Sequence, residues 1–208
     1  MTSMDNLEWT KTAKHVDNAS LDVGFVISDS FYYGADNDFT PEEWESSRTR
    51  ITQPELPKFG DFVLGEDVGD AGELLKYYRD VLILAKEHNK QIENRSSYFW
   101  IRPLIYKRDE FAITFPWYDT YEEIRRFLES VEEDKEGQVF WDRDQCWELT
   151  AHARNGRLYI REWDPDYEEE HVSVSLDFAS LRSQIEPTRN RIDNILTQLR
   201  AVLGKDYL

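Results

Sequence analysis

The residues most able to do chemistry in this sequence are the acids of REWDPDYEEE, residues 161–170, a stretch that holds six carboxylates. Carboxylate oxygens bind hard cations such as Ca²⁺, and two carboxyl groups of different pKa can act as general acid and base. Exposed carboxylates also attract a basic protein partner over a long range, or simply keep a turn hydrated. The choice among these four roles depends on where the fold places the stretch.

Four short segments around this stretch have the composition of β-strands: QVFWD (138–142), CWELTAHAR (146–154), RLYIREW (157–163) and HVSVSL (171–176). Asn155-Gly156 separates the second from the third, and both residues tolerate the positive φ of a two-residue hairpin turn. Such a turn fixes the register. It predicts the pairs Ala153 with Leu158, Ala151 with Ile160, Leu149 with Glu162, His152 with Tyr159, Thr150 with Arg161 and Glu148 with Trp163. One face of this antiparallel sheet is then small and apolar, and the other is polar and aromatic.

Alternate loops of a meander lie at the same end of its sheet. The loop at 142–145 and the loop at 164–170 should therefore lie together, opposite the Asn155-Gly156 turn. Tryptophans and Tyr167 lie beside the acids of both loops. The predicted partner-binding residues are Asp142, Asp144, Trp163, Asp164, Asp166, Tyr167, Glu168, Glu169 and Glu170.

Other kinds of site have less support in the sequence. DPDYEEEH lacks the spaced Asp/Asn ligands and central glycine of an EF-hand loop, so we predict no metal ligand. A catalytic carboxylate pair would need one buried acid and a pocket for the substrate, and we predict no catalytic residue and no cofactor. His15, His88, His152 and His171 do not have HExxH spacing. The single cysteine, Cys146, is expected to be an inert thiol.

Composition limits the class of protein. The 208 residues carry a formal net charge of -17, which argues against binding to nucleic acid and favours a basic partner. The polar start MTSMDNLEWTKTAK has no signal-peptide core, and no apolar run is long enough for a membrane helix. With one cysteine and no disulfide, we expect a cytoplasmic protein that binds neither membrane nor nucleic acid.

The remaining segments predict an α+β fold. Helical spacing of apolar residues predicts helices over 71–94 and 119–134, and a long C-terminal helix over 178–204 that starts at Asp177 and is kinked by Pro187. SYFWIRPLIY (97–106) and FAITF (111–115) predict a hairpin. The expected core, 71–208, is an antiparallel sheet packed against the kinked helix and two further helices. An irregular acidic portion, 1–70, should contain a strand at 23–27 and a short helix that starts after Thr40, where Glu43 completes a capping box.

The segment from FWDRDQCWEL through NGRLYIREWDPDYEEEHVSVSLDFASLRSQIEPTRNRI to LGKDYL resembles uncharacterised bacterial proteins that look like the immunity partners of secreted polymorphic toxins. The resemblance covers residues 139–208 and contains no catalytic motif. It implies a non-enzymatic protein that masks a toxin, commonly a basic nuclease, by charge complementarity. No residue role is carried over, because the resemblance has no defining motif.

We therefore expect a non-enzymatic, cytosolic, acidic binding protein of the immunity type that neutralises a basic toxin. Two alternatives stay open. One is a carboxylate- or metal-dependent hydrolase that uses the acidic loop end of the sheet. The other is a nucleic-acid mimic that displaces DNA from a basic groove.

Overall fold

The computed structural model describes residues 7–35, 39–92, 96–108, 110–115, 119–133, 135–144 and 146–208. The chain divides into two compact units. Unit 1 comprises Met1–Asp22, Pro103–Tyr118 and Glu122–Arg189, and unit 2 comprises Val23–Arg102, Asp119–Tyr121 and Asn190–Leu208. Segments from both sides of residue 70 therefore contribute to both units. Of the residues that the structure describes, 37% are helical and 32% lie in strands, which confirms the predicted α+β class.

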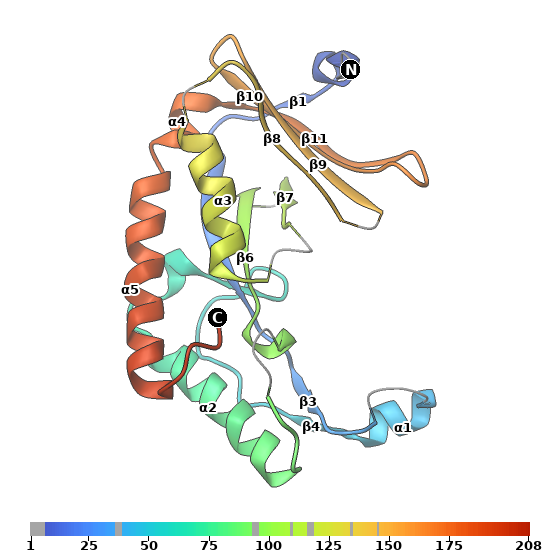
Figure 1. Ribbon diagram of the computed structural model, residues 1–208, viewed down its shortest axis with the longest axis vertical. Helices are drawn as coiled ribbons and strands as arrows, with labels where there is room; N and C mark the ends of the chain where they lie inside the picture. Colours follow the sequence, from blue (N-terminus) through green and yellow to red (C-terminus); the bar gives the residue numbers. More distant parts are fainter. Residues whose placement is uncertain are drawn as a thin grey trace. The chain divides into compact units, whose positions relative to one another are not determined.

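Unit 1 is built on a five-stranded sheet with the strand order β1-β11-β10-β9-β8 (Figure 1). Its strands are β1 (Lys14–His15), β8 (Gly137–Asp144), β9 (Trp147–Arg154), β10 (Arg157–Asp164) and β11 (Glu169–Asp177). Strands β8 to β11 form the predicted antiparallel meander. The two-residue strand β1, which the sequence did not predict, pairs with β11 in parallel.

The Asn155-Gly156 turn has the geometry that its sequence predicts. Asn155 has a φ of 53° and Gly156 a φ of 72°, so both turn residues are left-handed. All six predicted pairs between β9 and β10 are confirmed. The inner face of the sheet, which carries Leu149, Ala151 and Ile160, is buried.

The outer face, which carries Tyr159 and Arg161, is partly covered by the short 3₁₀ helix η1 (Leu7–Lys11). Trp9 of η1 meets Tyr159 edge to face, with ring centroids 6.5 Å apart. The Arg161 guanidinium lies over the Trp9 ring at 5.2 Å and over the Trp163 ring at 4.8 Å. Residues from the start of the chain thus stabilise the outer face of a sheet that is formed near its end.

The structure contains a four-stranded sheet with the order β5-β2-β6-β7 and a two-stranded sheet of β3 and β4. Their strands are β2 (Ser20–Val26), β3 (Ser30–Tyr32), β4 (Arg48–Arg50), β5 (Phe62–Leu64), β6 (Ile101–Lys107) and β7 (Phe111–Ile113). The predicted hairpin is confirmed, because Ile105 pairs with Ile113. Asp109 lies outside the described residues.

The helices follow the apolar periodicity of the sequence. They are α1 (Pro41–Ser46), α2 (Gly72–Glu87), α3 (Tyr121–Glu132), α4 (Phe178–Arg182) and α5 (Ile185–Leu203), with 3₁₀ helices η2 (Gly65–Asp67) and η3 (Ser97–Phe99). The capping box of α1 is confirmed, since Thr40 and Glu43 each bond the backbone of the other. Helix α2 ends earlier than predicted, before Asn89, which has a φ of 53°.

The predicted kinked C-terminal helix is confirmed as a bent segment of 26 residues. Asp177 accepts a hydrogen bond from the Ser180 amide at 2.6 Å and starts α4. The bend lies at Ser183 and Gln184, between α4 and α5. Pro187 falls in the first turn of α5, where its missing N–H removes no helical hydrogen bond. Among the described residues, no helix combines the length and apolarity that a membrane crossing requires.

The register of the five-stranded sheet should depend on the left-handed turn. In Gly156→Ala, a Cβ is forced into a φ of 72°, and we expect the free energy of unfolding to fall by about 1 kcal/mol. Urea denaturation followed by circular dichroism measures this. Gly69→Ala is the matched control, because a Cβ there meets no atom within 4 Å and the φ is not left-handed. Equal losses in the two variants would contradict the role of the turn.

Candidate interaction site at the hairpin tips

The loop between β10 and β11 is organised by its first acid. Asp164 is only 7% exposed, and its Oδ1 accepts hydrogen bonds from the amides of Asp166 at 2.9 Å and Tyr167 at 3.1 Å. This is the local side-chain-to-backbone bonding that Asp favours in turns. Glu168 then adopts a φ of 54°, which reverses the chain into β11. Asp164 was predicted to bind a partner, and the structure places its carboxylate in the turn itself.

The two acidic loops lie side by side, as predicted. Arg143, near the end of β8, forms an ion pair of 2.9 Å with Asp166 in the β10–β11 loop. Figure 1 shows the β8–β9 and β10–β11 turns at the same end of the sheet, away from the Asn155-Gly156 turn. Both partners are largely exposed, so the pair contributes at most about 1 kcal/mol to stability. The ion pair is informative because it shows that two loops separated in the sequence lie close together in the structure.

We call the exposed and half-buried residues of these two loops the tip surface. They are Trp141, Asp142, Arg143, Asp144, Asp166, Tyr167, Glu168, Glu169 and Glu170. Six carboxylates and one arginine give this surface a net charge of -5. Because these side chains reach water, the surface keeps its negative potential over about one Debye length, roughly 8 Å at physiological salt.

Aromatic side chains lie on the same surface. Tyr167 is 79% exposed and Trp141 is 51% exposed, which is unusual for rings of this size. Trp163, a predicted binding residue, is half-buried beside Arg161. Trp147 stacks on His171, with ring centroids 4.3 Å apart. The structure therefore adds Trp141 and Arg143 to the predicted site, and it shows the Trp163 ring in contact with the Arg161 guanidinium.

Sequence reasoning also missed Glu162, which is 4% exposed on the inner face of β10. Burial raises the pKa of its carboxyl to about 7, although backbone hydrogen bonds from Thr114 and Phe115 favour the charged form. Its Oε1 is buried without a hydrogen-bond partner among the described residues. The signal was present in the sequence, because the predicted register paired Glu162 with the apolar Leu149.

The backbone that contacts Glu162 is itself unusual. Phe115 is fully buried and has a φ of 46°, a conformation that is rare for an aromatic residue. Its ring packs on Phe127 of α3, with centroids 4.6 Å apart, and Phe127 meets Phe140 of β8 at 5.3 Å. This packing holds the Phe115 amide where the Glu162 carboxyl can accept from it.

The part of the chain that the structure describes contains no arrangement of side chains suited to bind a metal ion. There, no group of three or more His, Cys, Asp or Glu side chains is placed to hold a metal ion. Cys146, the residue before β9, is half-buried, and it is a free thiol.

Comparisons of the chain with protein-family models, with curated proteins and with solved structures found no match. The functional argument therefore depends on the geometry and charge of the site.

Glu162 should make stability depend on pH near neutrality. Its folded pKa is about 7 and its ordinary value is 4.5, so the folded state binds the proton more tightly. The contribution is complete below pH 4.5 and is lost as the pH rises through 7, a decrease of about 3 kcal/mol in the free energy of unfolding. Urea titrations at pH 5 and pH 8 should show a much smaller decrease in Glu162→Gln.

Glu169→Gln is the control for this experiment, because it replaces a glutamate carboxyl by the same amide at an exposed position of β11. We expect it to keep the pH dependence of the parent chain. If Glu162→Gln and the parent lose equal stability between pH 5 and pH 8, the carboxyl does not titrate in this range.

Proposed function

We propose that this protein binds a basic protein partner through the tip surface. The observation that carries the proposal is the Arg143–Asp166 ion pair of 2.9 Å. It joins the two loops that carry the exposed acids, and each loop has one exposed ring next to its partner in the pair, Trp141 near Arg143 and Tyr167 beside Asp166. Acids beside exposed aromatic rings are the combination that protein interfaces use for fast and lasting association.

The charges and the rings have different roles in this proposal. The carboxylates of Glu168, Glu169 and Glu170 are exposed and attract a basic surface before contact, which raises the association rate. Once the partner is in contact, Trp141 and Tyr167 lose water-exposed apolar area, which lowers the dissociation rate. Arg143 holds Asp166 in place and offers one positive group for an acceptor on the partner.

The finer form of the proposal is an immunity-type protein that neutralises a basic toxin in the cytoplasm. Two observations support it. Unit 1 carries 24 acids and 13 bases, a net charge of -11 of the total of -17, so the acidity is concentrated in the unit that bears the tip surface. The segment 139–208, which resembles immunity partners of polymorphic toxins, supplies all of that surface.

One observation favours the alternative, a hydrolase that uses carboxyl chemistry. A carboxyl of pKa about 7, such as that of Glu162, is suited to act as a general acid or base. However, Glu162 is 4% exposed, and the backbone of Thr114 and Phe115 contacts it. The exposed acids of the tip surface are separate from it, so the binding function fits the site better.

The tip acids should control how fast the partner associates. After affinity capture from the native cytosol with salt elution, the purified basic partner is tested against Glu169→Lys by stopped-flow kinetics. We expect the association rate to fall about threefold to tenfold at low salt and little at high salt.

Glu87→Lys on α2 makes the same change of charge at an exposed position of unit 2. It should leave the association rate within about twofold of the parent, because it leaves every charge of the tip surface unchanged. Equal effects of the two variants would mean that only total charge matters and that the tip surface is not the site.

Trp141 should control the lifetime of the complex. Trp141→Ala removes a ring that is 51% exposed, so the fold should be unaffected, and we expect the dissociation rate to rise about tenfold with an unchanged salt dependence of association. Surface plasmon resonance with the captured partner measures both rates. Ile83→Ala, at a similarly exposed apolar residue of α2, is the control. A dissociation rate that Trp141→Ala does not alter would place the contact elsewhere.

A further inference from the structure

In unit 2, strands β3 and β4 form a two-stranded arm that ends in α1. Ser30 pairs with Arg50, Phe31 with Thr49 and Tyr32 with Arg48. Figure 1 shows this arm extending away from α2, with α1 at its far end. We call residues 28–35 and 39–53 the arm.

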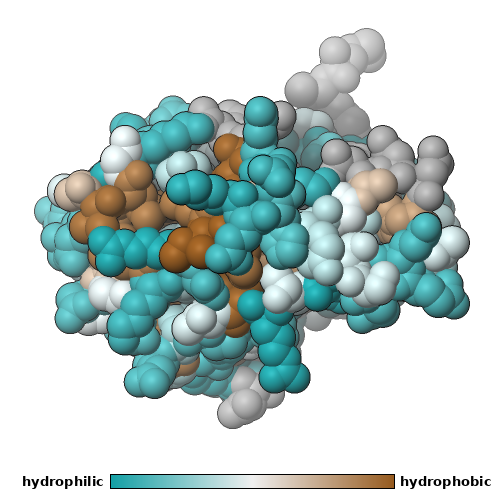
Figure 2. Space-filling view, turned by 90° about the horizontal axis from the view of Figure 1, so that it is seen from below, coloured by the Kyte–Doolittle hydropathy of each residue, from teal (hydrophilic) through white to brown (hydrophobic). Residues whose placement is uncertain are grey.

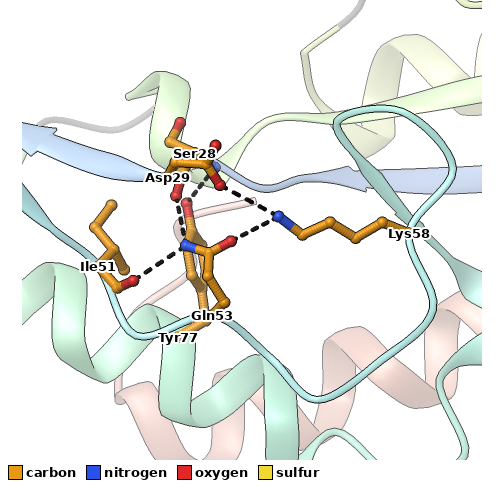
Figure 3. Close-up of polar contacts among 6 residues, drawn as sticks. All are labelled: Ser28, Asp29, Ile51, Gln53, Lys58 and Tyr77. Carbon is orange, nitrogen blue, oxygen red and sulfur yellow. Dashed lines mark hydrogen bonds and ion pairs between the residues drawn. The ribbon is translucent and has the colours of Figure 1, made fainter.

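The base of the arm is tied together by a polar network (Figure 3). The side-chain amide of Gln53 donates to the carbonyl oxygens of Ser28 and Ile51, both at 3.1 Å. Lys58 donates to the Gln53 side-chain oxygen at 2.6 Å and pairs with Asp29 at 3.3 Å. Both chain ends of the arm are therefore joined to each other and to the neighbouring loop.

The arm is also fixed to the helical part of unit 2. The Ser28 amide donates to the Tyr77 hydroxyl of α2 at 3.0 Å, and the Thr52 amide donates to Asp80 of α2 at 2.6 Å. Further out, the Tyr33 ring stacks on the His88 ring, with centroids 3.9 Å apart and planes 5° from parallel. These contacts position the arm independently of any partner.

The far end of the arm has contacts of a different kind. Helix α1 has six residues and buries none of them. A helix this short has little stability of its own, so its capping box and its contacts with neighbouring rings must hold it. The Trp44 ring lies 4.1 Å from the Tyr32 ring and 5.2 Å from the Phe39 ring. Tyr32, Phe39 and Trp44 therefore pack on one another beside a helix that has no buried residue.

Beside these rings the surface is hollowed. The hollow has a volume of about 420 Å³ and is lined by Phe39, Pro41 and Trp44. That volume falls within the roughly 300–1,000 Å³ of small binding clefts. Phe39 is 42% exposed. Figure 2 shows a small hydrophobic patch on the right, the side on which Figure 1 shows α1, with hydrophilic residues below it.

The charges around the hollow indicate what it would accept. Helix α1, PEEWES, has three glutamates and no basic residue. Arg48 already lies over the Trp44 ring at 5.2 Å and pairs with Glu45 at 3.5 Å, so this ring and these acids are compatible with a guanidinium group. A partner segment suited to this place has basic residues on either side of one apolar side chain.

We propose that the arm is a second docking surface, where a basic segment of a protein partner inserts one apolar side chain into the hollow lined by Phe39, Pro41 and Trp44. The inserted side chain gains apolar contact with both rings, and its basic neighbours pair with the glutamates of α1. This inference rests on the proposed basic partner, and it assigns that partner a contact in unit 2 in addition to the tip surface.

The test uses the full-length protein and three short peptides. The probe is Arg-Arg-Leu-Arg-Arg with blocked ends, and the comparison peptides are Arg-Arg-Gly-Arg-Arg and Glu-Glu-Leu-Glu-Glu. Binding is followed by the NMR signal of the Trp44 indole N–H, which is assigned by its loss in Trp44→Phe among the seven tryptophans. We expect the probe to shift this signal in a saturable way, the glycine peptide to bind at least about fivefold more weakly, and the acidic peptide to leave the signal in place.

Variants locate the binding. Phe39→Ala should weaken the probe about fivefold or more, whereas Ile83→Ala, which removes another exposed apolar side chain of unit 2, should not. An unshifted Trp44 signal, or equal affinities of Phe39→Ala and the parent, would overturn the proposal. So would a concentration-dependent dimer in sedimentation experiments that Phe39→Ala abolishes, because the occupant would then be a second copy of this chain.

A failure here is distinguishable from a failure of the proposed function. Glu169→Lys changes only the tip surface and should leave the probe's effect on Trp44 unaltered. If that variant slows partner association while Phe39→Ala has no effect on the probe, the arm is not a docking surface and the tip surface stands.

Discussion

The left-handed turn at Asn155 and Gly156 is the constraint on which the five-stranded sheet depends. Because side chains alternate with a period of two, a shift of one residue between β9 and β10 would exchange the inner and outer faces. The φ values of 53° and 72° match the twist of the strands and leave one register. In that register Ile160 is buried, Arg161 lies between two tryptophans, and the loops at the opposite end of the sheet come together.

The same register also has an energetic cost. It puts Glu162 on the inner face, where burial disfavours the carboxylate, while the exposed acids of the tip surface repel one another. An acidic chain of net charge -17 thus gains its long-range field at the expense of stability near neutral pH. The packing of Phe115, Phe127 and Phe140 offsets part of this cost, since it keeps two backbone amides in reach of the buried carboxyl.

The features that the sequence predicted are those set by neighbouring residues. The register follows from a two-residue turn, the start of α1 from Thr40 and Glu43, and the shared end of two loops from the order of strands in a meander. What escaped prediction depends on distant parts of the chain. Strand β1 has only two residues and no pattern of its own, and the ion pair of Arg143 needs the exact twist of two tips. The environment of Glu162 comes from residues 114 and 115, almost fifty positions away.

Cation–π contacts between arginine and tryptophan occur at several places in the structure. Arg48 lies over Trp44, Arg102 over Trp100 and Arg161 over Trp163. Each pair shows that an indole ring in this acidic chain is a favourable place for a guanidinium group, because the ring face and nearby carboxylates act together. The tip surface and the arm also place aromatic rings beside acids. There the rings of Trp141, Tyr167 and Phe39 are exposed to water. A basic partner would therefore meet, at both places, the chemistry that the chain already uses to hold its own arginines.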